Sequence, residues 1–146
     1  MDHRRHLIRE ALVTLLQGAG TLAAARVYDH PADPRTAFPA LSLRDASEQQ
    51  QALTLPAGAD RTIERLYLLD VDAEVLQATN YARTRDQLLA EVEAAFAAAT
   101  VAGVKSIAPA GYFALMNADT ERPSVIGRQR FEILYFTTQG APATAL

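Results

Sequence analysis

The stretch that decides the fold is residues 62–76, TIERLYLLDVDAEVL. Side chains alternate between the two faces of a β-strand, and here the odd positions are mostly apolar while the even positions collect carboxylates. The apolar positions are Ile63, Tyr67, Leu69, Val71, Ala73 and Val75, and the acidic positions are Glu64, Asp70, Asp72 and Glu74. The pattern predicts one long strand with a buried face and an acidic face.

Two segments with helical periodicity are expected to pack on the apolar face. The first is predicted over residues 2–17, where apolar residues recur at helical spacing before Gly18 and Gly20. The second is predicted to begin at a capping box, Thr84-Arg85-Asp86-Gln87, and to stop before Gly103. Its apolar stripe is Leu88, Leu89, Val92, Ala95, Phe96 and Ala99, and its smooth opposite side is Ala90, Ala94, Ala97 and Ala98.

The remaining strands are shorter or interrupted. Extended pieces are predicted at 26–28 and 38–43, and a closing hairpin at 104–116 and 125–138 with a polar connection at 117–124. Pro109 and Gly111 interrupt the first arm of this hairpin, so it is expected to bend there or to begin effectively at Tyr112. Residues 45–60 are irregular and predict a mobile excursion.

This order of elements predicts an α+β fold. It consists of a mostly antiparallel or mixed sheet of about four to five strands, with two main helices packed on one face. A chain of 146 residues with 49% hydrophobic residues suits a single domain. We expect that domain over residues 1–138 and a flexible tail over 139–146.

Composition excludes several classes of function. The chain has no cysteine, which excludes disulfides and thiolate chemistry and favours the interior of a cell. Its net charge is −3 and its basic residues are scattered, so no nucleic-acid patch is expected. It shows neither a signal peptide nor an apolar run long enough to cross a bilayer, which predicts a soluble protein without membrane contact.

Candidate chemistry is sparse. His3 and His6 share a helical face, but two ligands are too few for a zinc site. Asp29-His30 beside Asp33 resembles an oriented base, yet no motif supplies a nucleophile, so an ordered loop is the better interpretation. Gly18-Ala19-Gly20 lacks the spacing of a phosphate-binding loop.

The acidic row of Asp70, Asp72 and Glu74 allows three interpretations. It could bind a divalent cation or raise one carboxyl pKa for acid–base work. It could be the solvated side of a half-buried strand. It could also line a channel shared between subunits. We predict no catalytic, cofactor-binding or metal-binding residue and no enzymatic activity.

Several strings, in this order, resemble the minor tail protein U family, the tail terminators of long-tailed bacteriophages. They are HLIREALVTLL at 6–16, VYDHPADPRTAFPALSLRDASE at 27–48, RLYLLDVDAEV at 65–75 and FEILYFT at 131–137. The most telling is the short strand and Asp-containing loop that lead into Phe38-Pro39-Ala40. The approach to the last hairpin is longer than the family pattern and is interrupted by proline.

The resemblance implies a homohexameric ring that caps the tail tube, ends its polymerisation and joins the head. Its partners would be further copies of itself, the tail-tube protein and a head–tail connector, with DNA only as cargo in the lumen. It would act in the virion tail after assembly in the bacterial cytoplasm, without a cofactor. A ring subunit needs two unlike surfaces. The candidates are the alanine side of the second helix, residues 45–60 and residues 117–124.

The resemblance also suggests roles for particular polar residues. Asp70, Asp72 and Glu74 are candidates for a subunit boundary or the lumen, where negative walls would repel phosphates. The candidate partner-contact residues are Asp29, His30, Asp33, Glu48, Asp119, Glu121 and Arg122. Two alternatives remain open: a small ligand- or metal-binding α+β domain, and another head–tail connector or neck protein with the same fold.

Overall fold

The computed structural model describes residues 2–30, 37–54, 58–76, 79–117 and 124–146. The chain forms two helices and six strands in these parts. They follow in the order α1 (Arg4–Gln17), β1 (Val27–Asp29), β2 (Ala40–Ala52), β3 (Thr62–Leu76), α2 (Tyr81–Ala98), β4 (Val104–Asn117), β5 (Ser124–Thr138) and β6 (Ala141–Ala145).

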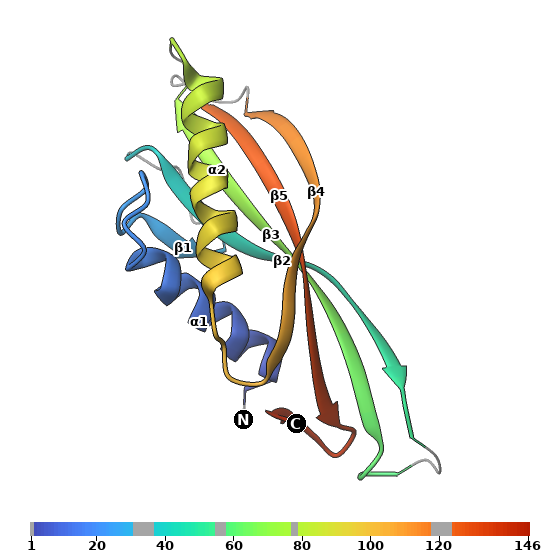
Figure 1. The fold of residues 1–146 in the computed structure, drawn as a ribbon. Helices are drawn as coiled ribbons and strands as arrows, with labels where there is room; N and C mark the ends of the chain where they lie inside the picture. Colours follow the sequence, from blue (N-terminus) through green and yellow to red (C-terminus); the bar gives the residue numbers. More distant parts are fainter. Residues whose placement is uncertain (1, 31–36, 55–57, 77–78, 118–123) are drawn as a thin grey trace.

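One sheet contains all six strands. Five of them lie in the order β1-β2-β3-β5-β4, and β6 pairs with the end of β5 (Figure 1). β1 runs parallel to β2, and every other pair is antiparallel. The predicted strand at 62–76 is β3, and it lies at the centre because both β2 and β5 pair along it.

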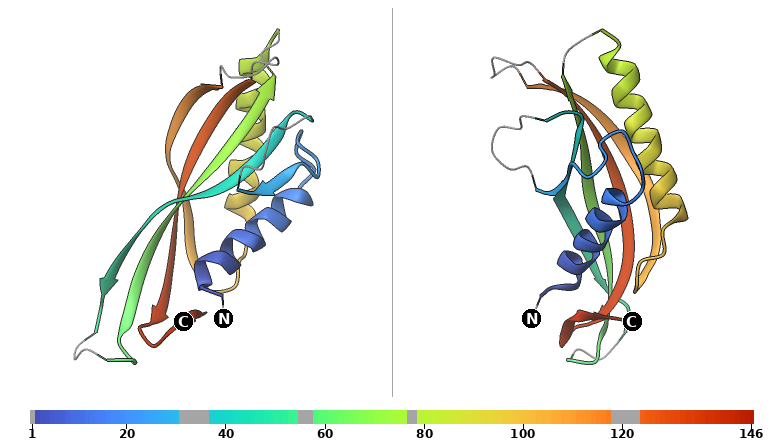
Figure 2. Two further views of the ribbon diagram at one scale, coloured as in Figure 1. Left: turned by 180° about the vertical axis from the view of Figure 1, so that it is seen from behind. Right: turned by 90° about the vertical axis from the view of Figure 1, so that its left-hand side faces the viewer.

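Both helices pack on the same face of this sheet and share one core (Figure 2). α1 buries Ile8, Leu12 and Leu16, which recur every fourth residue and so lie on one side of the helix. α2 buries Leu88, Leu89, Val92 and Phe96. They meet the odd positions of β3 and β5, and Phe96 packs edge-on against Phe131 with ring centroids 4.7 Å apart. The α+β fold with two helices on one face is confirmed.

The sheet extends well beyond the helices. In Figure 1 β2, β3 and β5 cross near their midpoints, and their lower halves continue past the ends of α1 and α2. The excursion predicted at 45–60 is wrong over its first half, because β2 continues to Ala52 and pairs with β3 as far as Ile63. Backbone pairing along the long β3 sets this segment, and its polar side chains give no alternating apolar signal.

The start of α2 differs from its prediction, and the first arm of the hairpin follows one of its two predicted alternatives. α2 begins at Tyr81 after Asn80, and Thr84 Oγ1 donates to the Asn80 carbonyl, so the predicted capping box does not cap this helix. β4 begins at Val104, because bulges at Val104/Ser106 and at Pro109/Gly111 absorb the interruption within the strand.

The C-terminal residues lie against the sheet. Within the tail predicted at 139–146, Ala141–Ala145 form β6, and the Leu146 amide donates to the Phe136 carbonyl at 2.9 Å. The tail therefore contributes a short edge strand at the end of β5.

Candidate assembly surfaces

The face of the sheet opposite the helices, called the open face, is formed by the even positions of β3. Directly paired residues of antiparallel strands point to the same side, so the register defines its rows. In the two central rows, Arg44, Asp70 and Arg130 lie side by side, and so do Ser42, Asp72, Arg128 and Phe113. Among the described elements, no helix packs on this face.

Asp70 and Asp72 are buried on the open face beneath arginines. Arg130 donates two hydrogen bonds to Asp70, at 2.8 and 3.2 Å. Arg128 binds Asp72 in the same bidentate way, at 2.7 and 3.0 Å, and Arg44 approaches the second oxygen of Asp72 at 2.9 Å. Planar guanidinium groups match carboxylates in this bidentate geometry.

The prediction of an acidic surface is therefore wrong for Asp70 and Asp72. Both side chains are 4% exposed, whereas those of Arg44, Arg128 and Arg130 are 33%, 21% and 32% exposed. The surface presents guanidinium groups in place of carboxylates, because β5 puts RQR (128–130) opposite DVD (70–72). Glu74, one row further, is half-buried and accepts a hydrogen bond from Ser124 at 2.9 Å.

The helix side of the sheet holds a second polar cluster, centred on Glu48. Its side chain is 5% exposed and lies 2.9 Å from Arg5 of α1 and 3.1 Å from Arg65 of β3. The Tyr135 hydroxyl donates to the other carboxylate oxygen at 2.5 Å. Glu48, predicted to contact a partner, instead joins α1 to three strands within the chain.

This cluster controls the ionisation of its members. Burial disfavours the charged form of Glu48, but hydrogen bonds from Tyr135 and Gln50 and the charges of Arg5 and Arg65 outweigh burial and hold its pKa below the ordinary value. Burial and the same contact raise the pKa of the Tyr135 phenol. Glu48 is thus a structural carboxylate that stays ionised at neutral pH.

Arg9 forms a neighbouring link between α1 and the sheet. Its guanidinium donates hydrogen bonds to Asp29 at 2.5 Å and to Asp45 at 2.8 Å. The Tyr67 hydroxyl also donates a hydrogen bond to Asp45. Asp29 also lies 2.7 Å from His30. Burial raises the pKa values of Asp29 and Asp45, yet their hydrogen bonds and cationic neighbours leave both below the ordinary value.

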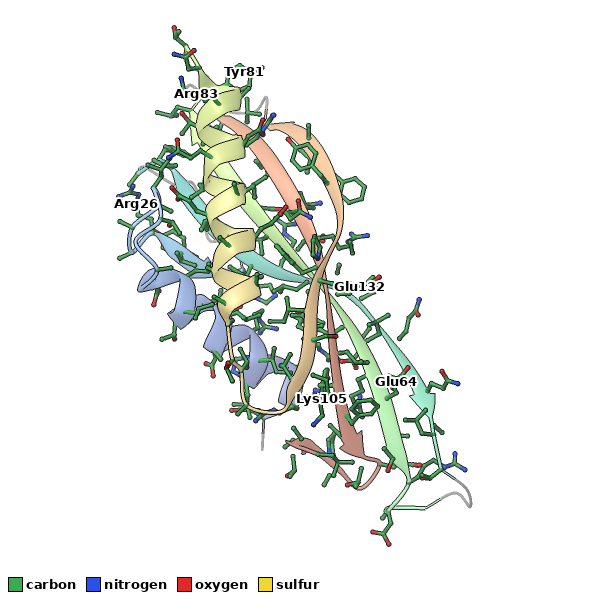
Figure 3. The ribbon with its side chains drawn as sticks, in the orientation of Figure 1. Arg26, Glu64, Tyr81, Arg83, Lys105 and Glu132 are labelled. Carbon is green, nitrogen blue, oxygen red and sulfur yellow. The ribbon has the colours of Figure 1, made fainter. Side chains whose placement is uncertain are left out.

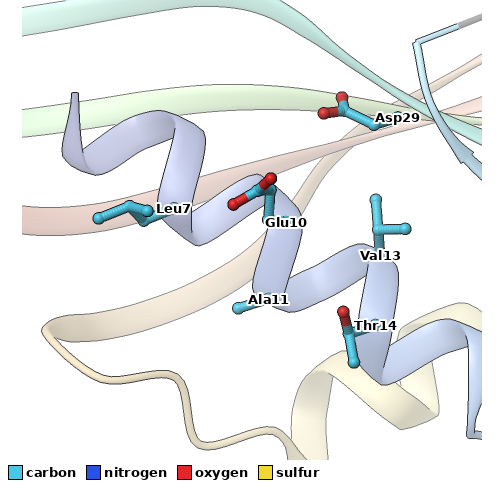
Figure 4. A pocket seen from close by; sticks show the side chains of 6 residues that line it. All are labelled: Leu7, Glu10, Ala11, Val13, Thr14 and Asp29. Atoms are coloured by element: carbon cyan, nitrogen blue, oxygen red, sulfur yellow. The ribbon is translucent and has the colours of Figure 1, made fainter. Parts of the chain in front are cut away.

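An open depression lies beside α1, lined by Leu7, Glu10, Ala11, Val13, Thr14 and Asp29 (Figure 4). Its two carboxylates already have partners, since Asp29 binds Arg9 and Glu10 lies 3.3 Å from His6. A small-molecule site usually has polar groups converging on a ligand. The residues that line the depression do not provide a set of polar groups that converge on a ligand.

The other predicted residues do not gather at one place. His3 caps α1, and its Nδ1 accepts a hydrogen bond from the Arg5 amide at 3.1 Å. Ala90, Ala94, Ala97 and Ala98 are exposed on the outer side of α2, as predicted. Asp33, Asp119, Glu121 and Arg122 lie outside the described residues.

Two further kinds of site are absent from the residues that the structure describes. No three His, Cys, Asp or Glu side chains are grouped so that they could hold a metal ion. Neither described helix combines the length and the apolarity that a membrane crossing requires.

No family model and no curated protein matches the sequence. Among solved structures, the chain is similar to one chain of a structure described as the virion of a native gene transfer agent (GTA) particle. The TM-score is 0.54 at 16% identity, and the match covers 87% of this chain and 94% of that one. At this identity the two chains share a fold.

Proposed function

We propose that this chain is a structural protein of a tailed, phage-like particle and acts there as a tail terminator. The observation that carries the proposal is the shared fold with a virion chain, which extends over nearly the whole length of both chains. The strings that resemble the minor tail protein U family support the narrower role. In that role the protein forms a homohexameric ring on the tail tube, ends its growth and receives the head connector, without turnover or a cofactor.

The site chemistry agrees with this proposal. Most charged groups of the described clusters have partners within the chain, as the Arg128–Asp72 and Glu48–Tyr135 contacts illustrate. Catalytic groups, by contrast, are usually left available to a substrate in a cleft. An uncovered sheet face and an exposed alanine side of α2 are surfaces that an assembly subunit could use.

Deletion of the encoding gene tests the terminator role. Without a terminator, tail tubes should grow to variable and excessive length and remain unjoined to heads, and a plasmid copy should restore both properties. Electron microscopy of the particles measures tail length and joining. Tails of normal length that fail to join heads would identify a neck protein, and normal joined particles would contradict a role in the virion.

The purified protein provides a second test. Native mass spectrometry and negative-stain microscopy should find closed rings of roughly six subunits at high concentration or on tail tubes. The opposing result is a monomer or dimer on which a divalent cation raises the melting temperature, because binding to the native state stabilises it. That result would favour a small metal-binding domain.

A further inference from the structure

The open face carries apolar side chains at both of its ends. The distal patch consists of four half-buried residues, Leu66, Leu68, Leu134 and Phe136. The proximal patch consists of Phe113, Leu115 and Ile126. Phe113 is 45% exposed and Leu115 is 37% exposed. Clustered apolar side chains on an uncovered face are typical of the core of an interface.

Two glutamates border the distal patch. Glu64 is paired with Phe136 across the strands, and Glu132 with Leu68. Figure 3 shows Glu64 on the half of the sheet that extends beyond the helices, and Glu132 near the crossing of the strands. Neither carboxylate forms an ion pair with the residues that the structure describes. The distal patch therefore has an acidic border without ion-pair partners among the described residues.

Guanidinium groups border the proximal patch. Arg128 is paired with Phe113, and the guanidinium of Arg130 lies 5.2 Å from the centre of the Phe113 ring. Nε of Arg44 is a buried donor without a hydrogen-bond partner. Asp70 and Asp72 are covered, so a partner that approaches this end meets the cationic side chains of Arg44, Arg128 and Arg130, with the half-buried Glu74 beside Ile126.

One chain cannot bring its two patches together. Leu134 and Ile126 lie in the same continuous strand, eight residues and roughly 26 Å apart. A second copy can, because the two patches are apolar and their borders carry opposite charges. When each copy uses its two patches on two different neighbours, the contact is heterologous, and it gives a ring where the rotation between copies closes.

We propose that the distal patch of one copy packs on the proximal patch of the next copy. In this contact Glu64 and Glu132 approach Arg128 and Arg130 of the neighbouring copy, around a core of apolar side chains. The inference rests on the proposed function in one respect: the repeated contact is taken to close into the proposed ring. Beyond the proposed function, the inference specifies which two surfaces of neighbouring copies are in contact.

Disulfide cross-linking tests this contact, because the chain has no cysteine of its own. The double variant Leu115→Cys/Leu134→Cys, oxidised as the assembled protein, should give a ladder on a non-reducing gel that stops at the ring size. A mixture of the two single variants should give dimers, while each variant alone should stay uncross-linked. As a matched control, Glu93→Cys replaces Leu134→Cys, since Glu93 is exposed on α2, on the helix side of the sheet.

A charge reversal gives an independent measurement. Glu132→Arg should weaken self-association by roughly tenfold or more, because it opposes like charges across the contact, and Glu93→Arg should leave it unchanged. Equal melting temperatures would show that both variants fold. Rings without the cross-link and without a response to Glu132→Arg would overturn this inference and leave the proposed function standing. Cross-linking of one single variant to itself would also overturn it, since that contact is symmetric. A chain that remains monomeric under every condition would overturn both.

Discussion

The carboxylate of Glu48 on β2 lies 2.5 Å from the hydroxyl of Tyr135 on β5, although β3 runs between the two strands. Both side chains rise on the helix side and meet above β3, where Arg5 and Arg65 also bind Glu48. The N-terminal part of α1 is thus attached to the sheet through charge-assisted hydrogen bonds.

Replacing Glu48 should destabilise the fold more than replacing its phenol partner. Glu48→Ala leaves two arginines and a hydroxyl without their acceptor. We expect a loss of about 2 kcal/mol in the free energy of unfolding, less than for a fully buried ion pair because Arg5 is 31% exposed. Tyr135→Phe removes one hydrogen bond and should cost about 1 kcal/mol. Urea denaturation measures both, and equal losses would contradict a central role for the carboxylate.

The Glu48 cluster and the neighbouring Arg9 contacts predict that the free energy of unfolding decreases at acidic pH. Asp29, Asp45 and Glu48 have folded-state pKa values below their ordinary values of 3.8, 3.8 and 4.5. A depressed folded pKa stabilises the native state above the unfolded pKa, and that stabilisation is lost as pH falls through the folded pKa. Stability should be flat near neutral pH and fall below about pH 4.5.

Thermal melts at a series of pH values measure this dependence. Glu48→Gln should have a shallower acid slope than the wild type, because it removes one of the titrating groups. The matched control is Glu93→Gln, an exposed carboxylate on α2, which should keep the wild-type slope. A slope unchanged by Glu48→Gln would show that other carboxylates carry the acid sensitivity.

Gly103 provides a test of the docked C-terminal strand. Its φ is +80°, and an added Cβ would lie 2.2 Å from the Cβ of Ala145 in β6. Gly103→Ala should therefore combine backbone strain of about 1–2 kcal/mol with displacement of β6. Gly20→Ala is the matched control, because its φ is +71° and no atom lies within 4 Å of the added Cβ.

A shortened chain separates the two effects. Removing residues 141–146 deletes Ala145, so in that background Gly103→Ala should cost as much as Gly20→Ala plus a small shift of Arg4, whose Nη2 lies 3.2 Å from the added Cβ. Urea melts of the four combinations give the coupling free energy as a double-mutant cycle. A coupling near zero would show that β6 is not held against Gly103 in solution.

Neutralising Asp72 should lower the free energy of unfolding more than neutralising the exposed Glu132. Asp72→Asn loses the charge that binds both Arg44 and Arg128, and we expect about 1–2 kcal/mol of destabilisation. Glu132→Gln should change monomer stability by less than about 0.5 kcal/mol, because its side chain is exposed. If Asp72→Asn were as stable as wild type, the arginines would have found other acceptors.

Local sequence patterns were sufficient for the main elements. The alternation at 62–76 predicted β3, and helical spacing predicted both α1 and the buried stripe of α2. These predictions depend on periodicity within one element, which survives whatever that element packs against. Polar segments show no apolar periodicity, so the sequence does not predict the second half of β2 as a strand.

Pairs between distant segments could be recognised only in the tertiary structure. DVD at 70–72 and RQR at 128–130 share the same two-residue spacing, which hints at a match, but nothing local fixes the register that brings them together. Spacing could not show that arginines cover Asp70 and Asp72, nor that Glu48 turns inward after the bulge at Asp45/Ser47.

The sequence by itself determined which residues form the core, the α+β class and the absence of thiol chemistry. The tertiary structure decided which charges reach solvent. Burial of a carboxylate depends on cations that arrive from other strands, and strand register places them there. The strand that the sequence marked as acidic is consequently the floor of an arginine-covered face, while Glu64 and Glu132 form no ion pair with other described residues.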